Sequence, residues 1–294
     1  MSTLVVGAAG ALGTAVCSEL RSAGHAVRAL VRAGSNTERL AVLDAGGVTL
    51  SHGDLKSPGT LENVLGGVQT VISTASAVGS TTEGDSIESV DLRGHLHLID
   101  AAKRAGVKHF VYVSFFRQDL DFPLQTAKRA VENELSSSAL RYTIFQPVDF
   151  MESWLGPVAG FDPAHGKAMV LGSGDNKTSW IALGDVAKFV AKAVGNERAF
   201  NRTFPLAGPE SLSQLEVLDI FRALGCPPFQ VDHLPEAVME ENFKASDAMA
   251  RSIAALMLQT ARGQRTSSAS ALEILPVQLT SVKQYAEKIL RSLQ

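Results

Sequence analysis

Three glycines near the N-terminus constrain the fold of this chain more than any other feature. The apolar run Leu4–Val6 leads directly into G-x-x-G-x-x-G at Gly7, Gly10 and Gly13, and a helical pattern follows over 11–23. The first glycine permits a tight turn, the second lets the backbone approach a phosphate, and the third lets the helix pack closely on the strand. The helix N-terminus then offers free N–H groups to an anion. This context favours a dinucleotide pyrophosphate site over an ordinary glycine-rich turn.

The end of the second expected strand indicates which dinucleotide is bound. The stretch 25–32 finishes on Arg32, where a fold that prefers NAD carries an acidic residue about 20 residues past the glycines. A guanidinium can bind a ribose 2′-phosphate with paired hydrogen bonds, and Ser35 and Asn36 could add neutral donors. The sequence therefore predicts NADP(H), with NAD(H) less favoured. The alternative is that Arg32 is only a solvated charge at a strand end.

Composition limits the class of protein. A chain of 294 residues with 45% hydrophobic and 19% charged residues can form a large α/β unit, alone or with a small lobe. A net charge of −3 argues against nucleic acid as a partner, and no apolar run reaches membrane-spanning length. The start shows no signal-peptide pattern, and Cys17 and Cys226 are too far apart to suggest a disulfide framework. We therefore expect a cytoplasmic protein. We also expect no metal site, because His95 and His97 would face different ways on a helix.

Apolar strand patterns alternate with helical patterns through the first half of the chain. Strands are expected at 25–32, 47–50, 68–73, 110–113 and 141–145, helices at 58–65, 90–105 and 125–136, and a loop at 81–89. This alternation predicts a Rossmann-like doubly wound parallel sheet, which binds ligands beyond the carboxyl ends of its strands. That edge would carry Gly10, Arg32, Asp54, Thr74, Ala75, Ser114 and Pro147.

The second half is less regular. We expect a dinucleotide-binding domain over 1–150 and a small C-terminal substrate lobe over 151–294, with a strand and helix near 178–206 returning to the core. The segment 147–175 is rich in Gly and Pro and is expected to be irregular. Phe150 and Trp154 could line an apolar pocket or belong to the core. His165 could donate a proton or be a surface histidine.

Several stretches together resemble the NmrA-like family, an atypical branch of the short-chain dehydrogenase/reductases. They are G-A-A-G-A-L-G, V-R-A-L-V-R, G-D-L, A-A-K-R-A-G-V-K-H-F-V-Y-V-S and A-K-R-A-V-E-N-E-L-S-S-S-A-L-R-Y-T-I-F-Q-P. The resemblance covers roughly residues 1–195. It implies kinship with isoflavone reductase-like enzymes, NAD(P)H:quinone oxidoreductases, and regulators that bind a dinucleotide without evident turnover.

The resemblance also implies a role for individual residues. The dinucleotide loop corresponds to Gly7, Ala9, Gly10, Ala11, Leu12 and Gly13. Arg32 corresponds to the 2′-phosphate arginine, Asp54 and Leu55 to the adenine site, and Thr74 and Ala75 to the nicotinamide ribose site, with Pro147 also near the cofactor. Ser114 matches the strand-end serine of the active site, Lys128 matches the lysine of the Tyr-x-x-x-Lys pair, and Asp149, Phe150 and Met151 match the loop that lines the substrate pocket.

One departure from the superfamily pattern concerns the chemistry. The tyrosine should lie four residues before Lys128, and that position is Leu124. None of the three tyrosines has a lysine four residues later. The usual acidified tyrosine is therefore missing, which argues against carbonyl reduction by that mechanism.

Two functions remain open. The chain could be an NADPH-dependent reductase that delivers hydride to a small apolar or aromatic conjugated acceptor, such as a quinone or an enone. Lys128 or water would then supply the proton, and Ser114 would be the other catalytic residue. It could instead be a non-catalytic NADP(H) sensor. For Lys128, an ordinary ion pair with Glu132 is the simpler alternative, and the sequence leaves a monomer and a homodimer open.

Overall fold

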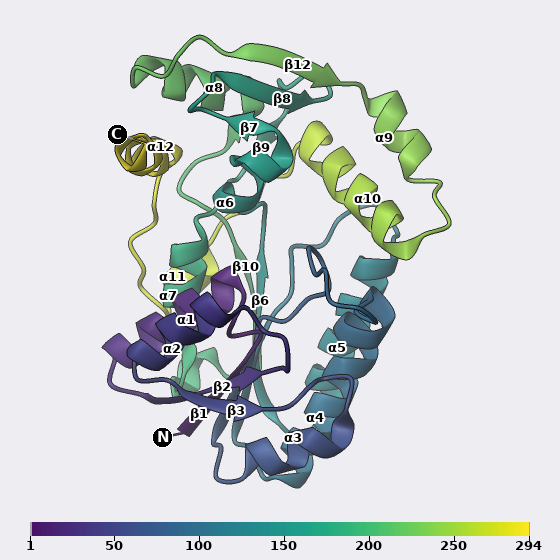
Figure 1. Cartoon of the computed structure of the whole chain (residues 1–294), viewed down its shortest axis with the longest axis vertical. Coiled ribbons are helices and arrows are strands. Elements are labelled where there is room, and N and C mark those ends of the chain that lie inside the picture. The colour runs from purple at the N-terminus through teal and green to yellow at the C-terminus, as the bar shows by residue number, and fades with distance from the viewer. Residues whose placement is uncertain (1, 294) are drawn as a thin grey trace.

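A seven-stranded parallel sheet lies at the centre of the molecule (Figure 1), in the computed structural model that describes residues 2–293. Its strand order is β10-β6-β5-β4-β1-β2-β3, which is the expected Rossmann-like arrangement. Val6 pairs with Leu30 on one side and Ser73 on the other, so the carboxyl ends of the central strands lie level. The strands are β1 (Ser2–Val6), β2 (Ala26–Val31), β3 (Thr49–His52), β4 (Thr70–Ser73), β5 (His109–Val113), β6 (Arg141–Pro147) and β10 (Arg202–Leu206).

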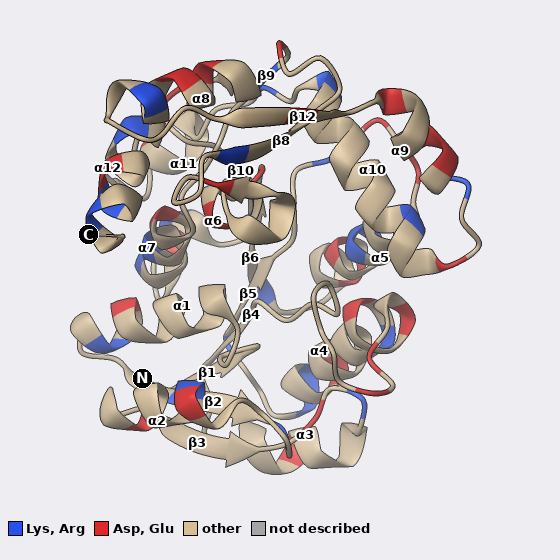
Figure 2. Ribbon diagram, turned by 45° about the horizontal axis from the view of Figure 1, so that its top comes forward, with Lys and Arg blue, Asp and Glu red and all other residues tan. Residues whose placement is uncertain are grey.

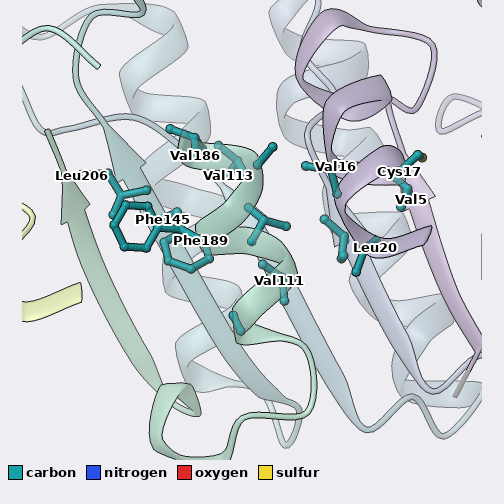
Figure 3. Packing of buried hydrophobic residues seen from close by; sticks show 14 of the residues in the cluster. Val5, Val16, Cys17, Leu20, Val111, Val113, Phe145, Val186, Phe189 and Leu206 are labelled. Carbon is teal, nitrogen blue, oxygen red and sulfur yellow. The ribbon is translucent and has the colours of Figure 1, made fainter. Parts of the chain in front are cut away.

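Helices cover both faces of this sheet. Val5 packs on one face with Val16, Leu20 and Phe189 (Figure 3), whereas its neighbour Leu4 packs on the other. Because both faces are buried, apolar residues are not confined to one face of the central strands, and polar residues there such as Thr3, Ser73 and Thr143 are themselves buried. On the first face lie α1 (Ala11–Ser22), α2 (Thr37–Ala45), α7 (Leu183–Ala193) and α11 (Ala269–Leu272), and on the second α3 (Pro58–Leu65), α4 (His95–Arg104) and α5 (Pro123–Ser137).

A lobe of smaller elements lies beyond the carboxyl ends of the strands (Figure 1). It contains a three-stranded sheet in the order β12-β8-β7 and the two-stranded ribbon of β9 and β11. Its strands are β7 (Phe161–Asp162), β8 (Lys167–Leu171), β9 (Lys177–Thr178), β11 (Leu212–Ser213) and β12 (Gln230–Leu234). Its helices are α6 (Met151–Trp154), α8 (Gln214–Ala223), α9 (Glu236–Asn242), α10 (Ala248–Arg262) and α12 (Val282–Ser292), and 3-10 turns occur at η2 (Pro157–Ala159) and η3 (Glu197–Ala199).

Some local expectations were wrong. The segment 147–175 is not irregular, since it holds α6, β7 and β8, of which β8 pairs with the distant strand β12. The expected helix over 90–105 begins earlier, at the π-helix η1 (Ile87–Gly94), because Ser86 and Ser89 form a reciprocal capping box that starts it. Helix α2 was not foreseen, although Asn36 caps it by accepting a hydrogen bond from the Arg39 N–H.

Charge is spread over the surface. Lys and Arg are interspersed with Asp and Glu over the outer helices and do not gather on one face (Figure 2). Within residues 2–293, no helix has both the length and the apolar character needed to cross a membrane.

Candidate active site

The glycine loop is built for close backbone approach. Gly7 has φ +82°, and a Cβ there would lie 2.7 Å from the Ala75 nitrogen. A Cβ on Gly13 would overlap the Gly7 carbonyl oxygen, so α1 can pack this tightly only on glycine. Gly10 is the N-cap of α1 and provides no side-chain cap. The first N–H groups of the helix are therefore available to an anion.

A groove of about 660 Å³ runs over this loop and across the carboxyl ends of β1, β2 and β4. With the exception of Lys128 and Pro147, every residue predicted to bind the cofactor lines it. These are Gly7, Ala9, Gly10, Ala11, Leu12, Gly13, Arg32, Asp54, Leu55, Thr74 and Ala75. The shape and the glycine cradle fit an extended dinucleotide.

The basic side chains at the β2 end of the groove already form ion pairs with an acidic side chain of the protein. Both carboxylate oxygens of Asp85 accept hydrogen bonds from Arg32 Nη1, at 2.9 and 2.8 Å, and Lys56 Nζ lies 2.8 Å from Asp85 Oδ1. Although partial burial opposes its charge, hydrogen bonds from Lys56, Ser80 and Arg32 lower the pKa of Asp85 to about 2. Arg39 also lines the groove and donates to the Ala9 carbonyl. Arg32 thus stays accessible, yet a bound 2′-phosphate would have to take it from Asp85.

A second cavity, of about 650 Å³, adjoins the groove at Val78 and Gly79, which line both. Its walls are largely apolar, and Phe150 and Trp154 lie in them as predicted for a substrate pocket. Pro147, predicted to lie near the cofactor, lines this second cavity and not the groove, and its contact with a cofactor stays a prediction. The polar side chains that line the cavity are Gln118, Asp149, Ser153 and Gln264, and α10 adds Ile253, Leu256 and Met257.

Two residues predicted for the pocket lie elsewhere. Met151 is fully buried in the core of the lobe, because it begins α6 and its N–H is held by the Ile181 carbonyl. The side chain of His165 is 75% exposed and pairs with Asp162 at 2.8 Å, outside the residues that line the cavity. The interpretation of His165 as a surface histidine is therefore the one that the structure favours.

Lys128 lies in a buried ion pair. Its ammonium is 5% exposed and lies 3.1 Å from Asp91 Oδ1, while Asp91 Oδ2 accepts the Ala77 N–H. Burial opposes the charge, but contact with Tyr112 and Asp91 raises the pKa of Lys128 overall. The alternative pair with Glu132 was wrong, because Glu132 binds Arg129 and Gln146 instead. Lys128 lines neither cavity, so the geometry does not place it in contact with an acceptor.

Ser114 is also held inside the protein. Its hydroxyl accepts a hydrogen bond from Arg129, which in addition binds the Phe115 carbonyl and lies over the Phe115 ring. Ser114 lines neither cavity. The catalytic role of Ser114 stays a prediction, and Ser114 and Arg129 hold the loop that carries Phe115 and Phe116 into the wall of the second cavity.

Sequence reasoning missed several residues of the site. Asp85 lies in the polar stretch after β4, which has no periodic pattern, whereas Asp91 lies in a helix, where nothing local shows that it pairs with Lys128. Arg39 could have been noticed, because Asn36 is a typical helix cap. Arg39 follows it by three residues, in the first turn of α2. The residues of α10 show helical spacing, but nothing local says that one face lines a cavity. Among residues 2–293, no group of three His, Cys, Asp or Glu side chains could hold a metal ion.

Comparison with known proteins adds family information. The profile of the NmrA-like family matches residues 2–286. A photosystem II assembly factor Ycf39 from Trieres chinensis is 32% identical over 80% of this chain and 72% of its own length. An NAD(P)H azoreductase from Xenophilus azovorans is 34% identical over 73% of this chain and 70% of its own length. The structure of the NADPH-dependent quinone oxidoreductase QOR2 from Escherichia coli with NADPH has the same fold, with a TM-score of 0.77 and 22% identity over 98% of this chain and 99% of that one.

Proposed function

This chain belongs to the NmrA-like family, and on that premise we propose that it is an NADPH-dependent reductase of small, apolar, conjugated acceptors such as quinones or enones. The observation that carries the proposal is the apolar cavity of about 650 Å³ that adjoins the nucleotide groove at Val78 and Gly79. An acceptor in that cavity would lie beside the part of the groove lined by Thr74 and Ala75, which is where the nicotinamide is expected.

The groove fits NADP(H) on structural grounds. The cradle at Gly7 and Gly13 would be filled by any Cβ, and the open N-terminus of α1 faces the pyrophosphate position. Arg32 and Arg39 would bind the 2′-phosphate, assisted by Ser35. The cofactor, when bound, supplies the hydride, and the protein supplies alignment with the acceptor and exclusion of water.

In this proposal Lys128 positions the site and does not react. Lys128 forms an ion pair with Asp91 and donates a hydrogen bond to the Ala75 carbonyl, while Asp91 accepts the Ala77 N–H, and together these contacts fix the segment that follows β4. That segment separates the groove from the interior and leads to Val78, where the two cavities meet. The pair therefore holds the boundary between the cofactor site and the acceptor site.

A second function is a non-catalytic NADP(H)-dependent protein factor. It is favoured by the relatives that are named photosystem II assembly factors, which are 30 to 32% identical to this chain over about four fifths of its length, and by the missing Tyr-x-x-x-Lys tyrosine at Leu124. The open apolar cavity favours the reductase, because a factor without a substrate has no need of one.

The test is NADPH consumption against a panel of quinones and enones, together with NADPH affinity. Leu256→Trp would fill the acceptor cavity without touching the groove, and Val238→Trp on the exposed surface of α9 is the matched control. We expect saturable turnover that Leu256→Trp abolishes while the Kd for NADPH stays unchanged. Tight NADPH binding with no turnover on any acceptor would reject the reductase in favour of the protein factor.

A further inference from the structure

Asp149 is an acid in an apolar cavity. It follows β6 by two residues, is 7% exposed, and is the one ionisable side chain among those that line the second cavity. Its backbone is fixed because its carbonyl accepts the Ile181 N–H. A carboxyl group in such surroundings is costly as an anion, since there is no cation in the cavity wall to balance it.

The hydrogen bonds around Asp149 are best satisfied if the carboxyl carries a proton. Thr260 Oγ1 lies 2.7 Å from Asp149 Oδ2 and 3.1 Å from the Leu256 carbonyl oxygen. A hydroxyl has one hydrogen, so it cannot donate to both acceptors fully. If Asp149 is protonated, it donates to Thr260 Oγ1, and Thr260 donates to Leu256. Asp149 Oδ2, Thr260 Oγ1 and the Leu256 carbonyl oxygen then each have a partner.

The neighbouring charges do not offset the burial of Asp149. Among the elements packed against it, Glu152 on α6 is bound to the Leu183 N–H, Arg117 is exposed, and Arg262 at the end of α10 pairs with glutamates of α9. Burial therefore raises the pKa of Asp149 to about 6, against a smaller lowering by the hydrogen bond from Thr260.

We propose that Asp149 is the proton donor of the reductase and that the acceptor is a neutral molecule whose reduced form needs a proton; this inference rests on the proposed function. A neutral acceptor that takes up a hydride, which is one proton with two electrons, becomes an anion, and bound NADPH would supply that hydride. The Asp149 O–H bond breaks, its proton goes to that anion, and the carboxylate regains a proton from solvent before the next turnover. Asp149 thus takes the role of proton donor. Leu124 stands where the superfamily has its tyrosine donor, and Lys128 is buried in an ion pair.

The first test compares two acceptors of different charge. A neutral quinone needs a proton after it accepts hydride, whereas a cationic triarylmethyl dye becomes neutral by accepting hydride alone. We expect Asp149→Asn, which keeps the shape and a donor for Thr260, to lower kcat for the quinone about 10²- to 10⁴-fold. The kcat for the dye should stay close to the wild-type value.

The other outcomes overturn the inference in different ways. Equal losses with both acceptors would mean that Asp149 is merely structural, and no loss with either would mean that it donates no proton. If wild-type protein reduces neither acceptor, the proposed function fails and this role fails with it.

The second test does not depend on turnover. Infrared difference spectra of the cofactor-free protein should contain a protonated-carboxyl band that titrates near pH 6, as the pKa of about 6 requires, and that disappears in Asp149→Asn. In the active protein, quinone kcat should fall as pH rises through about 6, because the acid form is lost, and the Asp149→Asn profile should be flat there. A carboxyl that is already ionised at pH 5 would refute the inference.

Discussion

On the proposed assignment of Arg32 to the 2′-phosphate, replacement of Arg32 by alanine should weaken NADPH binding and leave NADH binding nearly unchanged. In the free protein the Arg32 side chain is 33% exposed and its guanidinium holds Asp85 at 2.8 Å. A 2′-phosphate carries a charge of about −1.5 to −2, so it would compete successfully with that single carboxylate. Arg32→Ala removes the partner of the phosphate and leaves Asp85 bound to Lys56.

The size of the effect follows from these contacts. Hydrogen bonds from a guanidinium to a charged oxygen contribute about 1.5 to 3 kcal/mol, and loss of a partly exposed pair such as Arg32–Asp85 offsets about 0.2 to 1 kcal/mol of that. The net contribution to NADPH binding is about 0.5 to 2.8 kcal/mol, which corresponds to a roughly 2- to 100-fold change in Kd. NADH has no 2′-phosphate, so its Kd should barely change.

Isothermal titration calorimetry of both cofactors measures this directly. Arg28→Ala is a matched control, because Arg28 lies on the same strand but donates to the Gly66 carbonyl, away from the groove. We expect the ratio of the NADPH and NADH Kd values to change in Arg32→Ala and not in Arg28→Ala. An unchanged ratio in Arg32→Ala would refute the assignment of Arg32 to the 2′-phosphate.

Three further substitutions test the physical account of the fold. Gly13→Ala should cost about 1 to 3 kcal/mol of stability, because the new Cβ overlaps the Gly7 carbonyl; an unchanged thermal midpoint would contradict this. Asp85→Asn should cost about 1 to 2 kcal/mol at pH 7 once solvent screening is allowed for. Since the pKa of Asp85 is lowered from 3.8 to about 2, this difference should shrink as pH falls through about 2, and acid unfolding curves that stay parallel would speak against it. Lys128→Met should lower the free energy of unfolding in urea by about 3 to 5 kcal/mol, because it leaves the buried Asp91 carboxylate without its cation. A decrease below about 1 kcal/mol would mean that the ion pair contributes little to stability.

Much of the fold could be predicted from local patterns. Strand β1 ends in the unbroken apolar run Leu4–Val6 because both sheet faces are covered, and the glycines after it have the spacing that a strand–loop–helix unit requires. Helix α3 was predicted over 58–65 and occurs there, since Pro58 and the apolar spacing both act within the helix itself. The missing tyrosine at Leu124 was equally plain, because it depends only on a spacing of four residues.

The tertiary structure decided which charged groups are free and which are paired. Arg32 meets Asp85, 53 residues away in sequence, and Lys128 meets Asp91 across two helices, and no local pattern reports either contact. Thr260 reaches Asp149 over 111 residues because α10 folds back over the strand ends. The hydrogen bonds and the periodicity within one helix or strand depend on residues that are neighbours in sequence. Burial and ion pairing depend instead on which distant segments pack against that element. The sequence therefore determined the Rossmann-like fold and the candidate residues, and only the packed lobe determined which acid lines the apolar cavity.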